Sequence, residues 1–233
     1  MRAVHRHQLV FLREAGWQRL IAEAAGDAER QAVLRRWAGA GWPLVVSRQP
    51  CVQSAANDPG LLHLGLATPP GGGTRRWAVV AAWSELLFFA EFPLADQVLP
   101  LLSASQRPAW RQLLDGLAGL DVPARVYGSH GWELLTGQPH RRPGSDLDLY
   151  LPVQHAAQAD ALVALLQRTD AGLPRLDGEL IWPDGAAVAW REWQAWREGQ
   201  VRDLLVKRLR SVELLRELPG VEALPLPAER VRA

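Results

Sequence analysis

Cysteine and lysine are almost absent from this 233-residue chain. Cys51 is the single cysteine, which excludes an intrachain disulfide and a metal centre built from several thiolates, and favours a reducing compartment. Lys207 is the single lysine among 26 Lys and Arg residues, a bias typical of a GC-rich coding background. The abundance of arginine therefore says nothing about function by itself.

An excess of charge and long apolar runs are missing as well. The formal net charge of +1 argues against a general nucleic-acid or membrane-surface binder, which normally carries a basic face. The apolar run at 77–83 falls well short of the roughly 20 residues that a membrane helix requires, and the run within 1–16 is too short for a signal peptide. We expect a soluble, cytoplasmic protein with no nucleic-acid or membrane partner.

The first 90 or so residues mix helix and strand patterns. Apolar spacing over 17–39 predicts one or two amphipathic helices, and 43–49, 61–70 and 75–83 read as strands, the last two separated by a turn rich in Pro and Gly. We expect a small α+β domain over residues 1–92.

The remainder, residues 93–233, alternates strands with helices and predicts a second α+β domain with a mixed sheet and flanking helices. Helices are expected within 92–120, at 129–137, 156–169 and 192–217, and strands at 124–128, 146–153, 175–182 and 186–193.

Two aspartates interrupt the apolar strand "DLDLYLPV". Alternation along a strand puts Asp146 and Asp148 on one face, about 6–7 Å apart, while Leu147 and Leu149 point into the core. Two carboxylates at that spacing suit one divalent cation such as Mg²⁺ or Mn²⁺. The alternative is an ordinary half-exposed strand with polar residues in solvent.

Gly128 and Ser129 lie where a strand gives way to a helix, in "VYGSHGWELLTG". Free backbone N–H groups, the helix dipole and a hydroxyl converge there, which suits a phosphate. A serine cap after a glycine turn is the alternative. Together with the aspartate pair, these residues indicate a metal and nucleotide site.

Phosphoryl transfer to a hydroxyl calls for a third carboxylate, both to accept a proton and to bind metal. The following strand offers Asp177 and Glu179 on one face. We favour Asp177 as the third ligand and catalytic residue, with Glu179 as the alternative.

The stretch "YGSHGWELLTG…GSDLDLYL" resembles the glycine-serine and paired-aspartate signature of the nucleotidyltransferase superfamily that includes DNA polymerase β. More closely, with "GWPLVV", "LGLATPP" and "DGELIWPDGAAVAWREW", the chain resembles the phosphoribosyl-dephospho-CoA transferases of malonate decarboxylase systems, also called holo-[acyl-carrier-protein] synthases. The resemblance implies a polymerase-β-like catalytic domain. Its Gly-Ser maps onto Gly128 and Ser129, and its aspartates onto Asp146 and Asp148.

The resemblance also implies a reaction. These enzymes transfer the 2'-(5''-phosphoribosyl)-3'-dephospho-CoA group from its triphosphate precursor to a serine of the decarboxylase's acyl-carrier subunit and release pyrophosphate. Two alternatives share the same site residues: a nucleotidyltransferase acting on a small molecule or another protein hydroxyl, and a nucleotide-binding module without catalysis.

Several further side chains are candidates for binding phosphate or partner. Arg191 and Lys207 are the candidates chosen to bind substrate phosphates, and Arg141 and Arg142 are further candidates. For Lys207, chance retention or a plain amphipathic-helix face is the favoured alternative. A set of basic residues in the first domain is a candidate surface for an acidic carrier: Arg48, Arg75 and Arg76. His130 is more often structural, and core packing is favoured over base stacking for four tryptophans: Trp182, Trp190, Trp193 and Trp196.

Overall fold

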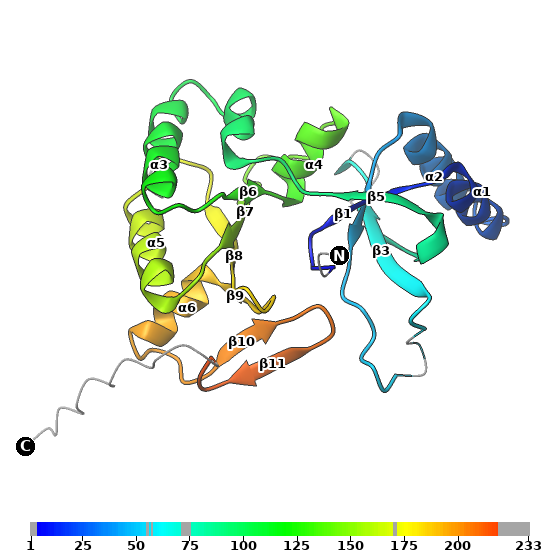
Figure 1. Cartoon of the computed structure of the whole chain (residues 1–233). Helices are drawn as coiled ribbons and strands as arrows, with labels where there is room; N and C mark the ends of the chain where they lie inside the picture. Colours follow the sequence, from blue (N-terminus) through cyan, green and yellow to red (C-terminus); the bar gives the residue numbers. More distant parts are fainter. Residues whose placement is uncertain (1–3, 55, 57, 71–75, 170–171, 219–233) are drawn as a thin grey trace, which may run out of the picture.

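A computed structural model describes residues 4–54, 56, 58–70, 76–169 and 172–218. Two sheets, each with its own helices and its own core cluster, stand side by side, and the chain passes from the first to the second after β5 (Figure 1). In the part of the chain described, no helix has both the length and the apolar character needed to cross a membrane.

The N-terminal unit is a five-stranded antiparallel sheet in the order β4-β3-β2-β1-β5. Alternation sends Leu62, Leu64 and Leu66 inward, where they share a core with Leu34 and Trp37 of the helices. The elements are β1 (Leu9–Leu12), α1 (Glu14–Glu23), α2 (Ala28–Ala40), β2 (Leu44–Val46), β3 (Leu61–Ala67), β4 (Arg76–Ala82), a 3₁₀ turn η2 (Trp83–Glu85) and β5 (Leu86–Ala90).

The C-terminal unit is a six-stranded sheet in the order β11-β10-β9-β8-β7-β6. Among the described strands, only β7 and β8 pair in parallel, because helix α5 connects them as a crossover. The elements are a 3₁₀ helix η3 (Ala95–Leu101), α3 (Arg107–Gly119), β6 (Arg125–Val126), α4 (Gly128–Thr136), β7 (Leu147–Pro152), α5 (Ala156–Thr169), β8 (Leu176–Ile181), β9 (Ala187–Ala189), α6 (Trp190–Arg197), β10 (Leu204–Lys207) and β11 (Val212–Leu215). The predicted α+β class, with a mixed second sheet, is confirmed.

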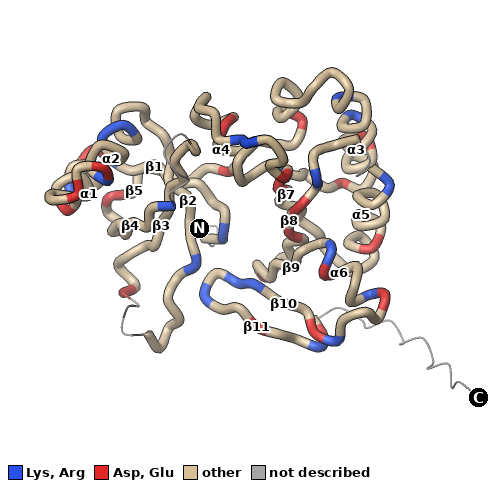
Figure 2. The backbone as a smooth tube through the Cα atoms, turned by 180° about the vertical axis from the view of Figure 1, so that it is seen from behind, with Lys and Arg blue, Asp and Glu red and all other residues tan. Residues whose placement is uncertain are grey.

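The two faces of the β7–β8 pair differ sharply. Leu147, Leu149 and Leu151 are fully buried against the core that contains α3 and α5, as the alternation predicts. Asp148 and Tyr150 face the other way and are only partly buried. That second face is turned toward the N-terminal unit, with the start of the chain between the two sheets (Figure 2).

The expected helix over 192–217 is wrong beyond its first turns. Helix α6 ends at Arg197, and Gly199 follows with a φ of 72°, a left-handed conformation that stops a helix. Leu204 and Val206 then alternate into the core, and β10 turns back into β11 through a bond from the Arg208 N–H to the Ser211 carbonyl. The apolar pattern of this segment is compatible with a hairpin as well as with a helix. The segment forms a strand because β10 pairs with β9.

Other boundaries also differ from expectation. The strand expected over 186–193 stops at Ala189, where helix α6 begins. Strands β1 and β5 were not predicted from the sequence; they pair with each other, and β5 forms the edge of the sheet.

The two units are joined by aromatic packing. Trp132 of α4 lies in the N-terminal core, 5.5 Å from the ring of Phe92 and 6.0 Å from that of Trp37. Helix α4, which belongs by sequence to the second unit, is therefore anchored in the first.

Candidate functional site

Asp148 and Asp177 lie directly opposite each other on the parallel strands β7 and β8. Both are half-buried, on the sheet face opposite to the leucine core. Parallel pairing points register partners to the same side, so the two carboxylates share one surface.

Asp148 is a carboxylate of this face with a strongly raised pKa. Burial and the negative charges of Asp177, Asp146 and Glu179 raise its pKa to about 7, although the positive charge of Arg76 opposes the shift. Among the described residues, no side chain donates a hydrogen bond to its carboxylate. The negative charge of ionised Asp148 is therefore only weakly balanced by cations.

Gly128 brings the start of α4 against Asp148. Its φ is +60°, and a Cβ built there would lie 1.8 Å from the Asp148 Oδ2, so any side chain at 128 would collide with the carboxylate. The Tyr127 N–H also donates to the Asp148 backbone carbonyl at 3.0 Å. Ser129 follows in the first turn of α4, half-buried, where helix N–H groups have no intrahelical partner. The glycine-serine pair and the carboxylates are thus adjacent in space.

Asp146 lies just before β7 and is held from two sides. Its Oδ2 accepts a 2.7 Å bond from Arg175 Nη1, and its backbone carbonyl lies 3.1 Å from His130 Nδ1. Burial, together with the charge of Arg141, lowers the pKa of His130 to about 4, so the imidazole is neutral at pH 7 and donates to that carbonyl. His130 is buried and bonded to the backbone, which favours the structural role expected for it.

Glu179 differs from Asp177, its neighbour two residues earlier on β8. It is 5% exposed and lies within 3.3 Å of three cationic or titratable groups, those of Arg6, His7 and Lys207. Burial opposes its ionisation, but the bond from His7 and the charge of Arg6 outweigh burial and hold the pKa of Glu179 well below its usual range. A carboxylate so occupied is a poorer candidate for a metal ligand than Asp177.

The predicted cationic residues are dispersed. Lys207 reaches the site face, since its Nζ lies 2.8 Å from Glu179 Oε1. Arg191 lies 4.1 Å above the ring of Trp190 and donates to the Leu176 carbonyl beside Asp177. Arg141 instead pairs with Glu133, away from this cluster. Arg142 is exposed.

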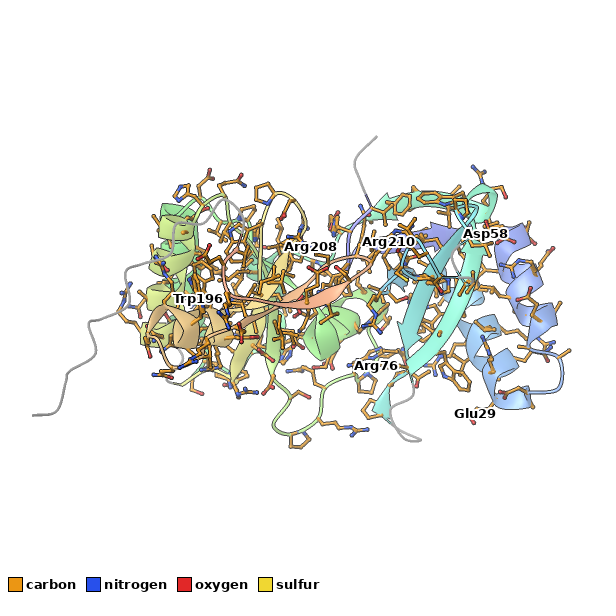
Figure 3. The ribbon with its side chains drawn as sticks, turned by 90° about the horizontal axis from the view of Figure 1, so that it is seen from below. Glu29, Asp58, Arg76, Trp196, Arg208 and Arg210 are labelled. Carbon is orange, nitrogen blue, oxygen red and sulfur yellow. The ribbon has the colours of Figure 1, made fainter. Side chains whose placement is uncertain are left out.

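The N-terminal unit also supplies residues near the carboxylates: Arg6 and His7, which the sequence did not single out, and Arg76, which was expected to meet the carrier. Arg6 and His7 reach Glu179. The charge of Arg76, the first residue of β4 (labelled in Figure 3), acts on Asp148. His7 has a φ of 66°, which is rare for a residue with a side chain and is often found where function fixes the backbone. The motif "HRH" at 5–7 was the feature of the sequence that could have indicated site residues here. Its position beside β8 depends on the pairing of β1 and could not be predicted from the motif alone. Arg48 is exposed, and Arg75 lies outside the described residues.

Tyr127 is a further, partly buried group beside the carboxylates. Burial, then the charges of Glu179, Asp148 and Asp177, raise its pKa far above the usual value, so the phenol keeps its proton. Its ring lies 4.2 Å from that of His7.

The donors suit a divalent cation in chemistry and position. Carboxylate oxygens are the ligands that Mg²⁺ and Mn²⁺ prefer, and Asp148 and Asp177 present them on one face with little compensation. Within the described residues, no three His, Cys, Asp or Glu side chains are already gathered around one point. Asp146 would have to leave Arg175, an exposed pair of the kind worth about 0–1 kcal/mol.

These features define the class of the protein: a two-unit α+β protein with a carboxylate site where the units meet. Comparison with known proteins gives the family. The model described as the phosphoribosyl-dephospho-CoA transferase MdcG N-terminal domain matches residues 5–92, and that of the C-terminal domain matches residues 93–217. The chain belongs to this transferase family, and the resemblance seen in its motifs is confirmed.

Curated relatives agree with this assignment. A phosphoribosyl-dephospho-CoA transferase of Xanthomonas euvesicatoria is 37% identical over 213 residues, which cover 90% of this chain and 93% of the relative. One of Bradyrhizobium diazoefficiens is 34% identical over 215 residues, covering 90% and 89%. One of Pseudomonas aeruginosa is 33% identical over 163 residues, covering 68% and 72%. No solved structure matches the chain.

Proposed function

We propose that the protein transfers the 2'-(5''-phosphoribosyl)-3'-dephospho-CoA group from its triphosphate precursor to a serine of the malonate decarboxylase acyl-carrier subunit. The family membership supports the donor. The observation that carries the chemistry is the register pairing of Asp148 with Asp177 beside the backbone of Gly128. Carboxylates next to free helix N–H groups are suited to a metal-bound polyphosphate.

The proposed step is a displacement at phosphorus. The serine oxygen of the carrier bonds to the α-phosphorus as the bond from that phosphorus to the β-bridging oxygen breaks, and pyrophosphate leaves. Asp177 accepts the serine proton, while Gly128, Ser129 and Lys207 hold phosphate oxygens. The enzyme forms no covalent intermediate.

Asp148 and Asp177, joined by Asp146 once it leaves Arg175, are the residues that would hold Mg²⁺ or Mn²⁺. Such an ion, when bound, neutralises phosphate charge and lowers the pKa of the attacking hydroxyl. The chain's own contribution is to hold these carboxylates on one rigid sheet face, with the α4 N-terminus fixed by Trp132.

The test is incubation of the protein with the triphosphate donor, apo carrier and Mg²⁺, followed by intact mass of the carrier. We expect a mass increase equal to the phosphoribosyl-dephospho-CoA group, together with one pyrophosphate per carrier. A carrier whose acceptor serine is replaced by alanine is the control. Pyrophosphate release with no change in carrier mass would assign the transfer to another hydroxyl.

A further inference from the structure

A cavity of about 600 Å³ adjoins the carboxylate site between the two units. Its lining includes Arg6 and Gln8 of the N-terminal segment. Glu91, which directly follows β5, and Tyr150 of β7 line it as well. Tyr150 lies two residues beyond Asp148 on the same face of β7, about 7 Å along the strand. The cavity therefore begins at the next side chain of that face.

Glu91 has one carboxylate oxygen occupied and one open. His5 Nε2 lies 3.0 Å from Glu91 Oε1, and Gln8 Nε2 donates to the same oxygen at 3.3 Å. Among the described residues, none donates a hydrogen bond to Glu91 Oε2, and the side chain is 29% exposed. Burial opposes its ionisation, yet the bond and the charge of His5 hold the pKa of Glu91 below its usual value. An ionised carboxylate with an oxygen to spare thus lines the cavity.

Two more groups of the wall can accept hydrogen bonds. Tyr150 is half-buried, and its hydroxyl has no hydrogen-bond partner among the described residues. Burial, then the charge of Glu91, raises the pKa of Tyr150, so the phenol keeps its proton and can both donate and accept. Gln8 is 8% exposed, and its Oε1 has no partner in the described structure either. Buried polar atoms are normally satisfied, so this excess of acceptors points to a ligand that supplies donors.

The other carboxylate of the lining is already satisfied. Asp184 Oδ2 accepts from Arg208 Nη1 at 2.6 Å, and its Oδ1 accepts from the Ala186 N–H at 3.0 Å. Arg6 forms an ion pair with Glu179, which places a cation on the side of the cavity nearest the carboxylate site. Within the described lining, Glu91 is therefore the carboxylate that is open to a ligand.

The diol of a pentose matches such a wall. Carboxylates commonly bind ribose hydroxyls, because each hydroxyl donates to a carboxylate oxygen in a charge-assisted hydrogen bond. In the proposed donor, the adenosine 2'-oxygen carries the phosphoribosyl group, so the only vicinal diol is the 2'',3''-diol of the phosphoribosyl pentose. This pentose is joined to the α-phosphate through O5'' and must lie beside that phosphate.

We propose that the cavity binds the phosphoribosyl pentose of the donor, with Glu91 Oε2 accepting from its 2'',3''-diol and the Tyr150 hydroxyl bonding to the same diol. The inference rests on the proposed function, since that function supplies the donor. The position of Tyr150 next to Asp148 on β7 supports it, because the pentose is the group that follows the α-phosphate in the donor.

The test measures binding without transfer. Calorimetry on the full chain, with Mg²⁺ and no carrier, compares the triphosphate donor with its 2'',3''-dideoxy analogue. Because the analogue loses hydrogen bonds to a charged carboxylate, we expect the unmodified protein to bind it at least about tenfold more weakly. This comparison leaves the protein unaltered, so it does not depend on a variant that folds.

Variants then assign the contacts. Glu91→Gln keeps the shape of the side chain and removes its charge, so the preference for the diol should fall below about threefold. Tyr150→Phe removes only the hydroxyl and should weaken the donor, but not its dideoxy analogue, by roughly two- to tenfold. Asp184→Asn makes the same change as Glu91→Gln at a carboxylate whose oxygens are occupied, so it should keep the full preference. Thermal melts establish that each variant is folded.

Equal affinity for donor and analogue, full preference in folded Glu91→Gln, or unchanged donor affinity in folded Tyr150→Phe would overturn the inference. An equal loss of preference in Asp184→Asn would overturn the assignment to Glu91 as well. The carrier-mass assay separates the two proposals. Carrier modification with no diol preference removes the cavity assignment and leaves the transfer. Diol preference without carrier modification removes the transfer to the carrier and leaves a donor site.

Discussion

Two carboxylates on one sheet face have opposite surroundings. Asp148 has like charges around it and a pKa raised to about 7, whereas Glu179 has Arg6, His7 and Lys207 around it and a pKa held low. The cations at Glu179 come largely from the N-terminal unit. One end of the face is therefore already neutralised by the fold, whereas the negative charge at the other end has little compensation from the described residues.

The largest effect should come from the end that is short of cations. Asp148→Asn keeps the shape of the side chain and removes its charge, so we expect carrier modification to fall by a factor on the order of 10³ or more while the fold persists. Single-turnover transfer, with circular dichroism as the folding check, measures this. Turnover within tenfold of the unmodified protein would show that Asp148 holds no metal.

Variants of Asp177 and Glu179, two residues apart on β8, sharpen the comparison between the two ends of the face. Asp177→Asn should lower transfer roughly 100-fold or more with donor affinity retained, because the proposed proton acceptor is lost while phosphate contacts remain. Glu179→Gln should instead cost roughly 2–3 kcal/mol of unfolding free energy, because it leaves partly buried cations unpaired. Transfer kinetics, calorimetry of the donor and urea unfolding measure the three quantities. An inactive but stable Glu179→Gln beside a normal Asp177→Asn would make Glu179 the third ligand.

The acidic end also predicts a pH dependence of stability. A folded pKa near 7 for Asp148, above its unfolded value of about 3.9, means that the native state binds more protons in that interval. Stability of the metal-free protein should therefore fall as pH rises from about 4 to 7 and then level off.

Asp148→Asn should remove that slope and be more stable than the unmodified protein at pH 8, by on the order of 4 kcal/mol, since the pKa of Asp148 is raised by about three and each pKa unit is worth about 1.4 kcal/mol. Urea unfolding in EDTA at pH 5 and pH 8 gives the difference between the two proteins, which cancels other titrating groups. Parallel pH profiles would contradict the raised pKa.

Local pattern predicted much of the second unit. Helix α5 and strand β7 follow from periodicity and alternation, and the juxtaposition of Gly128 with Asp148 follows from a strand-helix-strand order. The roles assigned to these residues stay predictions. The order of elements along the sequence does not predict the contact between residues 5–7 and β8, because that contact depends on the pairing of β1 with β2 and β5. The β10–β11 hairpin was missed for the same reason: long-range pairing overrode a local helical pattern.

The smallest effect concerns the ion pair that holds Asp146. Arg175 and Asp146 meet at 2.7 Å with side chains 58% and 33% exposed, so solvent screens most of their attraction. Arg175→Gln should change the unfolding free energy by less than about 1 kcal/mol.

If Asp146 must leave Arg175 to bind the cation, the same variant should need a lower Mg²⁺ concentration for half-maximal transfer, by roughly two- to fivefold, with an unchanged maximum rate. Arg208→Gln breaks the Asp184 pair, on a neighbouring hairpin and away from Asp148, and is the matched control that should leave the Mg²⁺ dependence unchanged. A higher Mg²⁺ requirement in Arg175→Gln would mean that Arg175 orients Asp146 toward the site rather than competing for it.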